Sequence, residues 1–209
     1  LEPRLCAALG RKRRSWGYLK GLKANPIVIR KIGKRFGQNH SATGQYGGKG
    51  MAIEIRDGVD YMEDVRTLIE TYTNWLGLDL AFQNLASELE NPAQKYAPPH
   101  GAILVAVQDG KVFGMVAWHW IGEGVCEMKR LFVLPEARGL GIAETLVYAI
   151  IESAQKAGGQ EMVLDTLEGM KAARHLYEKL GFRPCEPYYH NPLEGVVYLK
   201  KILKNSESE

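Results

Sequence analysis

Cysteine is scarce in this 209-residue chain, and the three that occur form no Cys-x-x-Cys pair. An odd, scattered set of cysteines does not make a disulfide framework, so we expect a reducing compartment, the cytoplasm. The five histidines show no metal-ligand spacing, and no metal is predicted. No apolar run approaches the ~18 residues that a membrane span needs, so no membrane partner is predicted.

The overall composition is that of an ordinary globular protein, with 45% hydrophobic and 24% charged residues. These values exclude a wholly disordered or collagen-like chain. A chain of this length is expected to form one domain with a sizeable hydrophobic core.

Acidic residues are almost absent from residues 1–50, where Glu2 faces twelve Lys and Arg residues. The net charge of this segment is +11, which leaves −8 for residues 51–209. Because the segment has nine glycines and no sustained apolar period, we predict a flexible basic arm or linker at residues 1–50. An organelle import signal is the alternative. We predict one folded domain at residues 51–204 and a polar tail at residues 205–209.

Apolar residues recur with strand and helix periods after Met51, a pattern typical of an α/β fold with helices packed on a mixed sheet. Asp109-Gly110, between two apolar segments, predicts a hairpin turn. Gly158-Gly159 and Gly181 stand where helices are expected to end. Strands are expected at residues 52–56, 102–107, 111–120, 125–134, 161–165, 182–186 and 196–202, and helices at residues 60–76, 81–90, 140–157 and 168–180.

A glycine-rich turn, Arg138-Gly139-Leu140-Gly141, separates a predicted strand from a long predicted helix. Free N–H groups at the start of a helix favour an anion such as a pyrophosphate. A dinucleotide-binding fingerprint would need a third glycine, where this chain has Glu144, and the Gly-Lys-Ser/Thr of a P-loop is absent. Taken alone, the two glycines are also compatible with a plain tight turn.

The pattern Arg138-x-x-Gly141-x-Ala143 resembles the acyl-CoA pyrophosphate loop of the GNAT superfamily of N-acetyltransferases. Residues 127–133 and 173–182 are similar to their GNAT counterparts at the expected spacing, and the resemblance covers residues 51–204 in element order. It implies the GNAT fold, with a mixed central sheet of about six to seven strands flanked by helices, and acetyl-CoA as co-substrate.

The same resemblance implies where acetyl-CoA binds. Backbone groups of residues 131–133 would hold the pantetheine like an added strand, and one N–H would polarise the thioester carbonyl. Many relatives have Asn seven residues before the helix tyrosine, where this chain has Met170, so one side-chain contact to the CoA arm is not expected. The predicted cofactor-binding residues are Leu131, Phe132, Val133, Arg138, Gly139, Leu140, Gly141, Ile142, Ala143, Glu144, Thr145, Ala173 and Tyr177.

Tyr177 is the first predicted catalytic residue. The resemblance puts it beside the thioester sulfur, where a phenol with a pKa of about 10 can protonate the leaving thiolate. Tyr177 also shares a helix stripe with Met170, Ala173 and Leu180, so a core aromatic is the alternative.

Glu127 is the second predicted catalytic residue, because it matches the glutamate that some GNAT members use as general base. An attacking ammonium must lose a proton, and a carboxylate can accept it directly or through water. In an alternating strand Glu127 shares a face with Lys129, Leu131 and Val133. Pairing with Lys129 or Arg130, or a role in orienting substrate, is the alternative.

Four other residues have side chains that could take part in catalysis or acceptor binding. His190 could replace the base, although a surface histidine is the simpler interpretation. Cys126 alternates to the face opposite Glu127, which argues against an acyl-cysteine route. Trp118 and Trp120 lie near the expected acceptor side, yet strand tryptophans are usually core residues. By resemblance, residues 77–101 should border the acceptor cleft.

The sequence therefore predicts transfer of acetyl from acetyl-CoA to a primary amine of a small molecule or peptide, by direct attack in a ternary complex. The charge of −8 in residues 51–209 favours a cationic amine. The alternative is a nucleic-acid-associated protein that binds through the basic arm and carries a CoA-sensing or inactive domain. A homodimer is left open.

Overall fold

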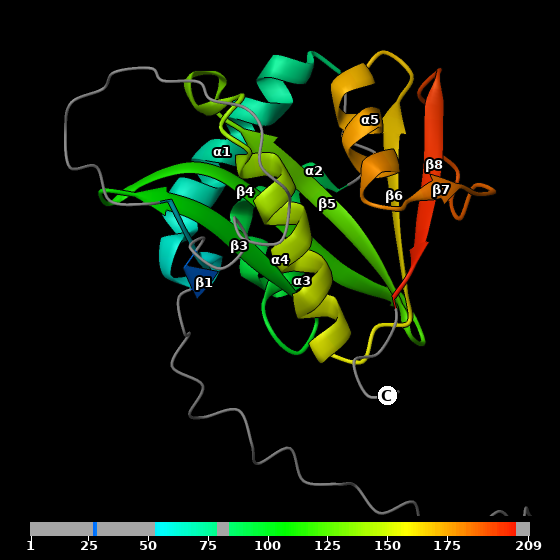
Figure 1. Ribbon diagram of the computed structural model, residues 1–209, viewed down its shortest axis with the longest axis horizontal. Coiled ribbons are helices and arrows are strands. Elements are labelled where there is room, and N and C mark those ends of the chain that lie inside the picture. The colour runs from blue at the N-terminus through cyan, green and yellow to red at the C-terminus, as the bar shows by residue number, and fades with distance from the viewer. Residues whose placement is uncertain (1–26, 29–52, 79–83, 204–209) are drawn as a thin grey trace, which may run out of the picture.

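The computed structural model describes residues 27–28, 53–78 and 84–203, which form one mixed sheet with helices on both faces (Figure 1). The strands follow the order β1-β2-β3-β4-β5-β6-β8-β7, and among neighbouring pairs β5 and β6 run parallel while the others are antiparallel. The strands are β1 (Ile27–Val28), β2 (Glu54–Asp57), β3 (Gly101–Gln108), β4 (Lys111–Gly122), β5 (Val125–Val133), β6 (Glu161–Leu167), β7 (Arg183–Pro184) and β8 (Val196–Ile202). The predicted mixed α/β sheet is confirmed.

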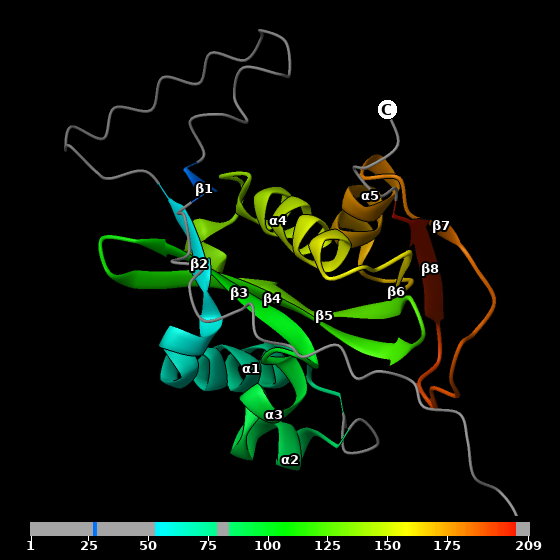
Figure 2. The same ribbon diagram turned by 90° about the horizontal axis from the view of Figure 1, so that it is seen from below.

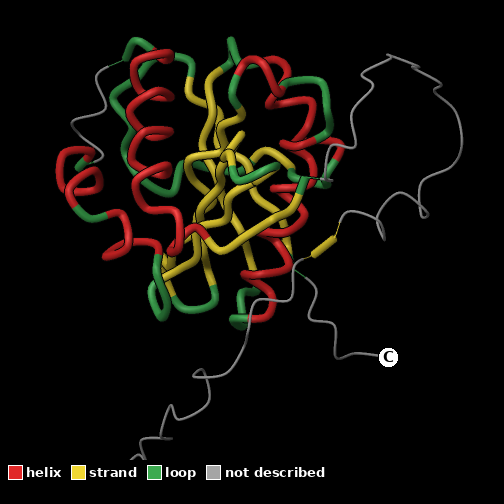
Figure 3. Tube along the Cα trace, turned by 90° about the vertical axis from the view of Figure 1, so that its left-hand side faces the viewer, coloured by secondary structure: helices red, strands yellow, loops and turns green. Residues whose placement is uncertain are grey.

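Helices cover the two faces of the sheet in separate groups, as the views in Figures 2 and 3 show. Helices α1, α2 and α3 lie on one face, and α4 and α5 lie on the other (Figure 2). Each group has its own core of buried apolar side chains against the sheet. The helices are α1 (Met62–Leu76), α2 (Leu85–Glu90), α3 (Pro92–Tyr96), α4 (Ile142–Lys156) and α5 (Lys171–Lys179).

The apolar period of the sequence places α1 as expected. Val65, Leu68 and Ile69 point into the core beneath the sheet and are buried. The helix ends at Gly77, whose φ of 66° is in the left-handed region and whose N–H bonds to Thr73 O. This is the usual glycine stop of a helix.

A β-bulge in β5 changes which face its side chains occupy. Met115 of β4 is paired with Phe132 of β5, and Ala117 with Lys129. One residue therefore separates the two pairs on β4, whereas two residues separate them on β5. Arg130 lies between these pairs with a φ of 60°. An extra residue in one strand shifts the alternation of the side chains that follow it.

The bulge corrects the expectation that Glu127, Lys129, Leu131 and Val133 share one face. Before the bulge, Cys126 and Met128 belong to the core under α4, and Glu127 and Lys129 point the opposite way. After it, Leu131 and Val133 pack on the α4 side, while Phe132 belongs to the core under α1. Strict alternation could not anticipate this change, because no glycine marks the bulge.

The parallel strands β5 and β6 pair only at their start. Val125, Cys126 and Glu127 lie opposite Glu161, Met162 and Val163, and the ladder then ends although both strands continue. Lys129–Val133 of β5 and Asp165–Leu167 of β6 instead line a common cavity. The divergence of the two strands therefore creates the space for a ligand.

Some boundaries differ from the sequence prediction. The second helix ends at Glu90, before Asn91-Pro92, as expected. The short helix α3 that Pro92 then opens was not predicted; the first position of a helix needs no N–H donor, so proline is tolerated there. The strand expected at residues 182–186 is reduced to Arg183–Pro184. Residues 52, 79–83, 204 and the tail at 205–209 lie outside the described residues.

The predicted arm at residues 1–50 also lies outside them, apart from Ile27–Val28, which pairs with β2. No helix in the described ranges has the length and apolar character to cross a membrane.

Candidate active site

A cavity of about 720 Å³ opens between the diverging ends of β5 and β6. The end of α1, the start of α4 and one face of α5 complete its wall. A volume of this size is typical of small-molecule and cofactor sites. Of the predicted cofactor-binding residues, those that line it are Leu131, Phe132, Val133, Arg138, Gly139, Gly141, Ile142, Ala143, Glu144, Ala173 and Tyr177.

The glycine turn before α4 leaves room for a ligand. Gly139 and Gly141 have φ values of 81° and 76°, and no atom lies within 4 Å of a Cβ built at either position. Thr145 N–H makes the first helical bond, to Gly141 O, so the N–H groups of the three residues before it remain available. These features fit the binding of a phosphate group at the start of α4.

Two predicted residues of this turn do not line the cavity. Leu140 is 66% exposed. Thr145 Oγ1 donates to Gly141 O at 3.1 Å, so its hydroxyl supports the turn. Arg138 does line the cavity: its Nε donates to Val133 O at 3.2 Å, and its guanidinium lies 5.1 Å from the Trp75 ring.

Tyr177 is both a buried residue of the core and a residue of the cavity wall. Its side chain is buried, with its ring 5.8 Å from that of Phe182 in an edge contact, and it lines the cavity from α5. Burial, with a smaller effect of negative charge on Asp165, raises the pKa of the Tyr177 phenol well above its usual value. The hydroxyl therefore stays protonated at neutral pH and can donate a hydrogen bond.

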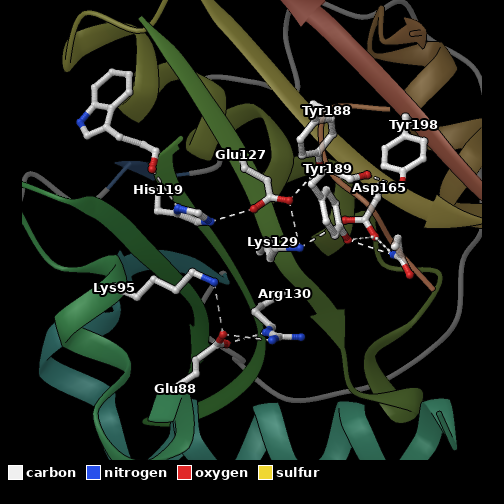
Figure 4. A network of polar contacts seen from close by, with 12 residues as sticks. Glu88, Lys95, His119, Glu127, Lys129, Arg130, Asp165, Tyr188, Tyr189 and Tyr198 are labelled. Carbon is white, nitrogen blue, oxygen red and sulfur yellow. Dashed lines mark hydrogen bonds and ion pairs between the residues drawn. The ribbon is translucent and has the colours of Figure 1, made fainter. Parts of the chain in front are cut away.

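Glu127 lies in a buried network of donors (Figure 4). Its Oε2 accepts from His119 Nε2 at 2.8 Å, and its Oε1 accepts from Tyr188 OH at 2.7 Å and pairs with Lys129 Nζ at 3.0 Å. His119 Nδ1 is 3.1 Å from Trp120 O. Of the pairings considered from sequence, the one with Lys129 is present.

The network keeps Glu127 negatively charged. Burial alone would raise its pKa, but the hydrogen bonds from His119 and Tyr188 and the charge of Lys129 outweigh this effect and lower the pKa to about 2. Burial likewise opposes the charge of Lys129, yet Glu127 and Asp165 raise its pKa. A charged pair therefore persists beside the cavity at neutral pH.

Asp165 connects this network to the loop before β8. One oxygen faces Lys129 Nζ at 3.2 Å, and the other accepts from Tyr189 OH at 3.0 Å and from Asn191 Nδ2 at 3.1 Å. Tyr198 OH donates to Tyr189 O at 3.0 Å. Lys129 and Asp165 line the cavity, whereas Glu127 lies behind them and is not among its lining residues.

No side chain of the remaining candidates has a hydrogen bond or ion pair to this network among the described residues. Cys126 belongs to the core under α4, and burial raises the pKa of its thiol to about 12, which disfavours a thiolate nucleophile. His190 is exposed. Trp118 is buried on the α4 side, where its Nε1 donates to Ser153 Oγ at 3.1 Å and Trp120 packs beside it.

Sequence reasoning missed most of the network. His119 and Asp165 had no role assigned, because the residues that contact them come mainly from other strands and loops. The alternation of β4 and its antiparallel pairing with β5 could have placed His119 opposite Glu127, the register that the structure has. Within the described ranges no group of three His, Cys, Asp or Glu side chains is arranged to hold a metal ion.

Comparison with known proteins finds a matching family model and similar N-acetyltransferases. The family model described as Acetyltransferase (GNAT) family matches residues 64–182. An uncharacterized N-acetyltransferase of Schizosaccharomyces pombe is 48% identical over 141 residues, covering 66% of this chain and 86% of that protein. An N-acetylaspartate synthetase of Xenopus tropicalis is 34% identical over 122 residues, covering 58% of this chain and 44% of that protein.

Solved structures share the fold. A GNAT-family acetyltransferase from Staphylococcus aureus Mu50 has a TM-score of 0.63 at 21% identity, covering 73% of this chain and 100% of that chain. A putative acetyltransferase from Salmonella typhimurium, solved with its cofactor acetyl-CoA, has a TM-score of 0.55 at 19% identity, covering 76% of this chain and 98% of that chain.

Proposed function

Because this chain belongs to the GNAT family and is an acetyl-CoA-dependent N-acetyltransferase, we propose that it acetylates a primary amine of a small molecule or peptide by direct attack in a ternary complex. The observation that carries the proposal is the cavity between β5 and β6. It runs from the glycine turn, which suits a pyrophosphate, past Tyr177 to Lys129 and Asp165. Both substrates can therefore occupy one continuous space.

The chain's backbone binds and polarises the thioester in this proposal. Beyond Glu127 the edge of β5 that faces β6 has no strand partner among the described residues. Its free N–H and C=O groups can hold the pantetheine, and an N–H there can stabilise the charge that develops on the carbonyl oxygen. Arg138 and the first turn of α4 hold the pyrophosphate.

Tyr177 faces the leaving sulfur and donates its hydroxyl proton toward it. Complete transfer from a phenol with a raised pKa to a thiolate with a pKa near 8.5 is uphill. The larger part of its effect is therefore a hydrogen bond that stabilises the thiolate as the C–S bond breaks.

Glu127 acts as the proton acceptor through an intervening water or hydroxyl, since it lies behind the cavity wall. A carboxylate with a pKa of about 2 is a weak base. It is therefore suited to the nitrogen after attack, when bonding to the carbonyl carbon has made that nitrogen acidic. The amine attacks in its neutral form, having first lost its ammonium proton to solvent water, and Glu127 accepts the second proton through the intervening water or hydroxyl.

Two observations point to opposite charges on the part of the acceptor beyond its amine. The net charge of −8 in residues 51–209 favours a cationic molecule at long range. The wall beside the bulge instead presents Lys129 and Arg130. Relatives named N-acetylaspartate synthetase support a small molecule over a protein as acceptor.

The test uses the full chain with acetyl-CoA and a panel of polyamines, amino acids, aminoglycosides and short peptides, and it follows the release of free thiol. The proposal predicts that at least one amine raises thiol release well above the rate without acceptor. Retained acetyl-CoA binding with no amine-dependent release across the panel would overturn it, and would favour the CoA-sensing alternative.

A further inference from the structure

Arg130 occupies an unusual position in the strand that borders the cavity. It is the extra residue of the β5 bulge, and its φ of 60° is uncommon for a residue other than glycine. Such backbone conformations cost free energy and concentrate at functional sites. The bulge turns Arg130 toward α2, on the same face of the sheet as Lys129.

Glu88 of α2, which does not line the cavity, binds the Arg130 guanidinium. Nε donates to Glu88 Oε1 at 2.5 Å and Nη2 donates to Glu88 Oε2 at 3.0 Å (Figure 4). The side chains of Arg130 and Glu88 are only 3% and 2% exposed, and Lys95 Nζ lies 3.6 Å from Glu88 Oε2. Burial opposes the charge of Glu88, but its bonds to Arg130 outweigh this effect and lower its pKa.

The guanidinium retains unused donors. It carries five N–H bonds, and Glu88 accepts two of them. Across the part of the chain that the structure describes, no other side chain or carbonyl accepts a hydrogen bond from Arg130. A buried cation with free donors is favourable only if an anion or water completes its shell.

The cavity supplies the place for that anion. Arg130 and Lys129 line it, whereas Glu88, the partner of Arg130, and Glu127, one of the two carboxylate partners of Lys129, do not. The nearby carboxylate in the wall is Asp165, whose oxygens already accept from Lys129, Tyr189 and Asn191. Lys129 is already paired with two carboxylates, so the end of the cavity beside the bulge offers a ligand the remaining donors of Arg130.

We propose that Arg130 binds a carboxylate of the acceptor, so that the acceptor is an amino acid and not a simple cationic amine. This inference rests on the proposed acetyl transfer and names its substrate class. Guanidinium and carboxylate form parallel, charge-assisted hydrogen bonds, which fix the orientation of the acceptor as well as its affinity. The adjacent Leu131 begins the segment that faces the thioester, so a bound carboxylate sets the amine close to the reacting carbonyl.

The first experiment compares matched acceptors with the full chain at saturating acetyl-CoA. The pairs differ only in the carboxylate: phenylalanine and phenethylamine, alanine and ethylamine, lysine and cadaverine. We expect kcat/KM to be about 10- to 100-fold higher for the amino acid of at least one pair, the range for hydrogen bonds to a charged group. Equal or higher values for every decarboxylated partner overturn the carboxylate site while leaving acetyl transfer intact. If no member of any pair is acetylated while another amine of the wider panel is, the carboxylate site is overturned and acetyl transfer stands; if the whole panel fails, the proposed function fails as well.

The second experiment replaces the guanidinium. Arg130→Lys keeps the positive charge beside Glu88 but loses the planar pair of donors, so KM for the amino acid should rise at least about tenfold while kcat/KM for the matching amine stays within about twofold. Lys156→Gln is the control, because it removes an exposed charge on α4 that pairs with Glu152. Equal effects of Arg130→Lys on amino acid and amine would contradict the proposal. If that variant does not fold, the wild-type comparison of matched acceptors decides.

Discussion

Glu127 and His119 lie directly opposite each other on β5 and β4, with Glu127 Oε2 and His119 Nε2 2.8 Å apart. His119 Nδ1 faces the carbonyl of Trp120, which can only accept a hydrogen bond. Glu127 is the shared acceptor of His119, Tyr188 and Lys129, and its basicity depends on all three.

This relationship predicts the pH dependence of catalysis. Because the pKa of Glu127 is lowered to about 2, its carboxylate is already ionised throughout the range from pH 5 to pH 9. Glu127→Gln should lower kcat/KM by about 10²-fold at every pH in that range without moving the midpoint of the acidic limb. The measurement is kcat/KM against pH for the wild type and Glu127→Gln, and loss of the acidic limb in Glu127→Gln would show that Glu127 itself titrates there.

The same shift predicts a pH dependence of stability. The pKa of Glu127 is lowered from 4.5 to about 2 on folding, so its ionisation stabilises the folded chain above pH 4.5, and that contribution is lost as the pH falls toward 2. The free energy of unfolding should therefore fall more steeply between pH 5 and pH 3 for the wild type than for Glu127→Gln. Urea unfolding at several pH values measures both slopes, and identical slopes would count against the lowered pKa.

Tyr177→Phe separates the hydroxyl from the ring. The ring packs against Phe182 in the core, so the phenylalanine variant should keep its melting temperature and its affinity for acetyl-CoA. Loss of the hydrogen bond to the leaving sulfur should lower kcat by roughly 10²-fold. A marked drop in melting temperature with near-normal kcat would instead make Tyr177 a purely structural residue.

Gly141→Asp tests the pyrophosphate position at the start of α4. The backbone at Gly141 is left-handed and no atom lies within 4 Å of an added Cβ, so the substitution introduces a negative charge into open space. Gly141→Asn is the matched control, since Asn has the same shape, tolerates the same backbone and is neutral. Calorimetry should show acetyl-CoA binding at least about tenfold weaker for Asp than for Asn. Equal affinities would place the pyrophosphate elsewhere.

The fold could be predicted from sequence because its signals are local. Apolar periods gave the strands and helices, and the glycine turn with its flanking strand gave the family. Apart from the cross-strand pairing of His119 with Glu127, the network around Glu127 could not be predicted, since β6 and the loop before β8 join it through side chains distant in sequence. The bulge at Arg130 had no glycine to mark it, and it reversed the faces expected for Leu131 and Val133. An amphipathic helix period also does not distinguish a core wall from a cavity wall: Tyr72 of α1 packs against the core under α1 and lines the cavity as well.

The central claim is that acetyl passes directly from acetyl-CoA to the amine while both lie in the cavity between β5 and β6. Initial rates measured over a matrix of acetyl-CoA and acceptor concentrations test this most directly. Attack in a ternary complex predicts reciprocal plots that intersect, together with an unmodified chain by intact-protein mass spectrometry after incubation with acetyl-CoA alone. Parallel reciprocal plots and a covalently acetylated chain would contradict it, because they would require an acyl-enzyme intermediate.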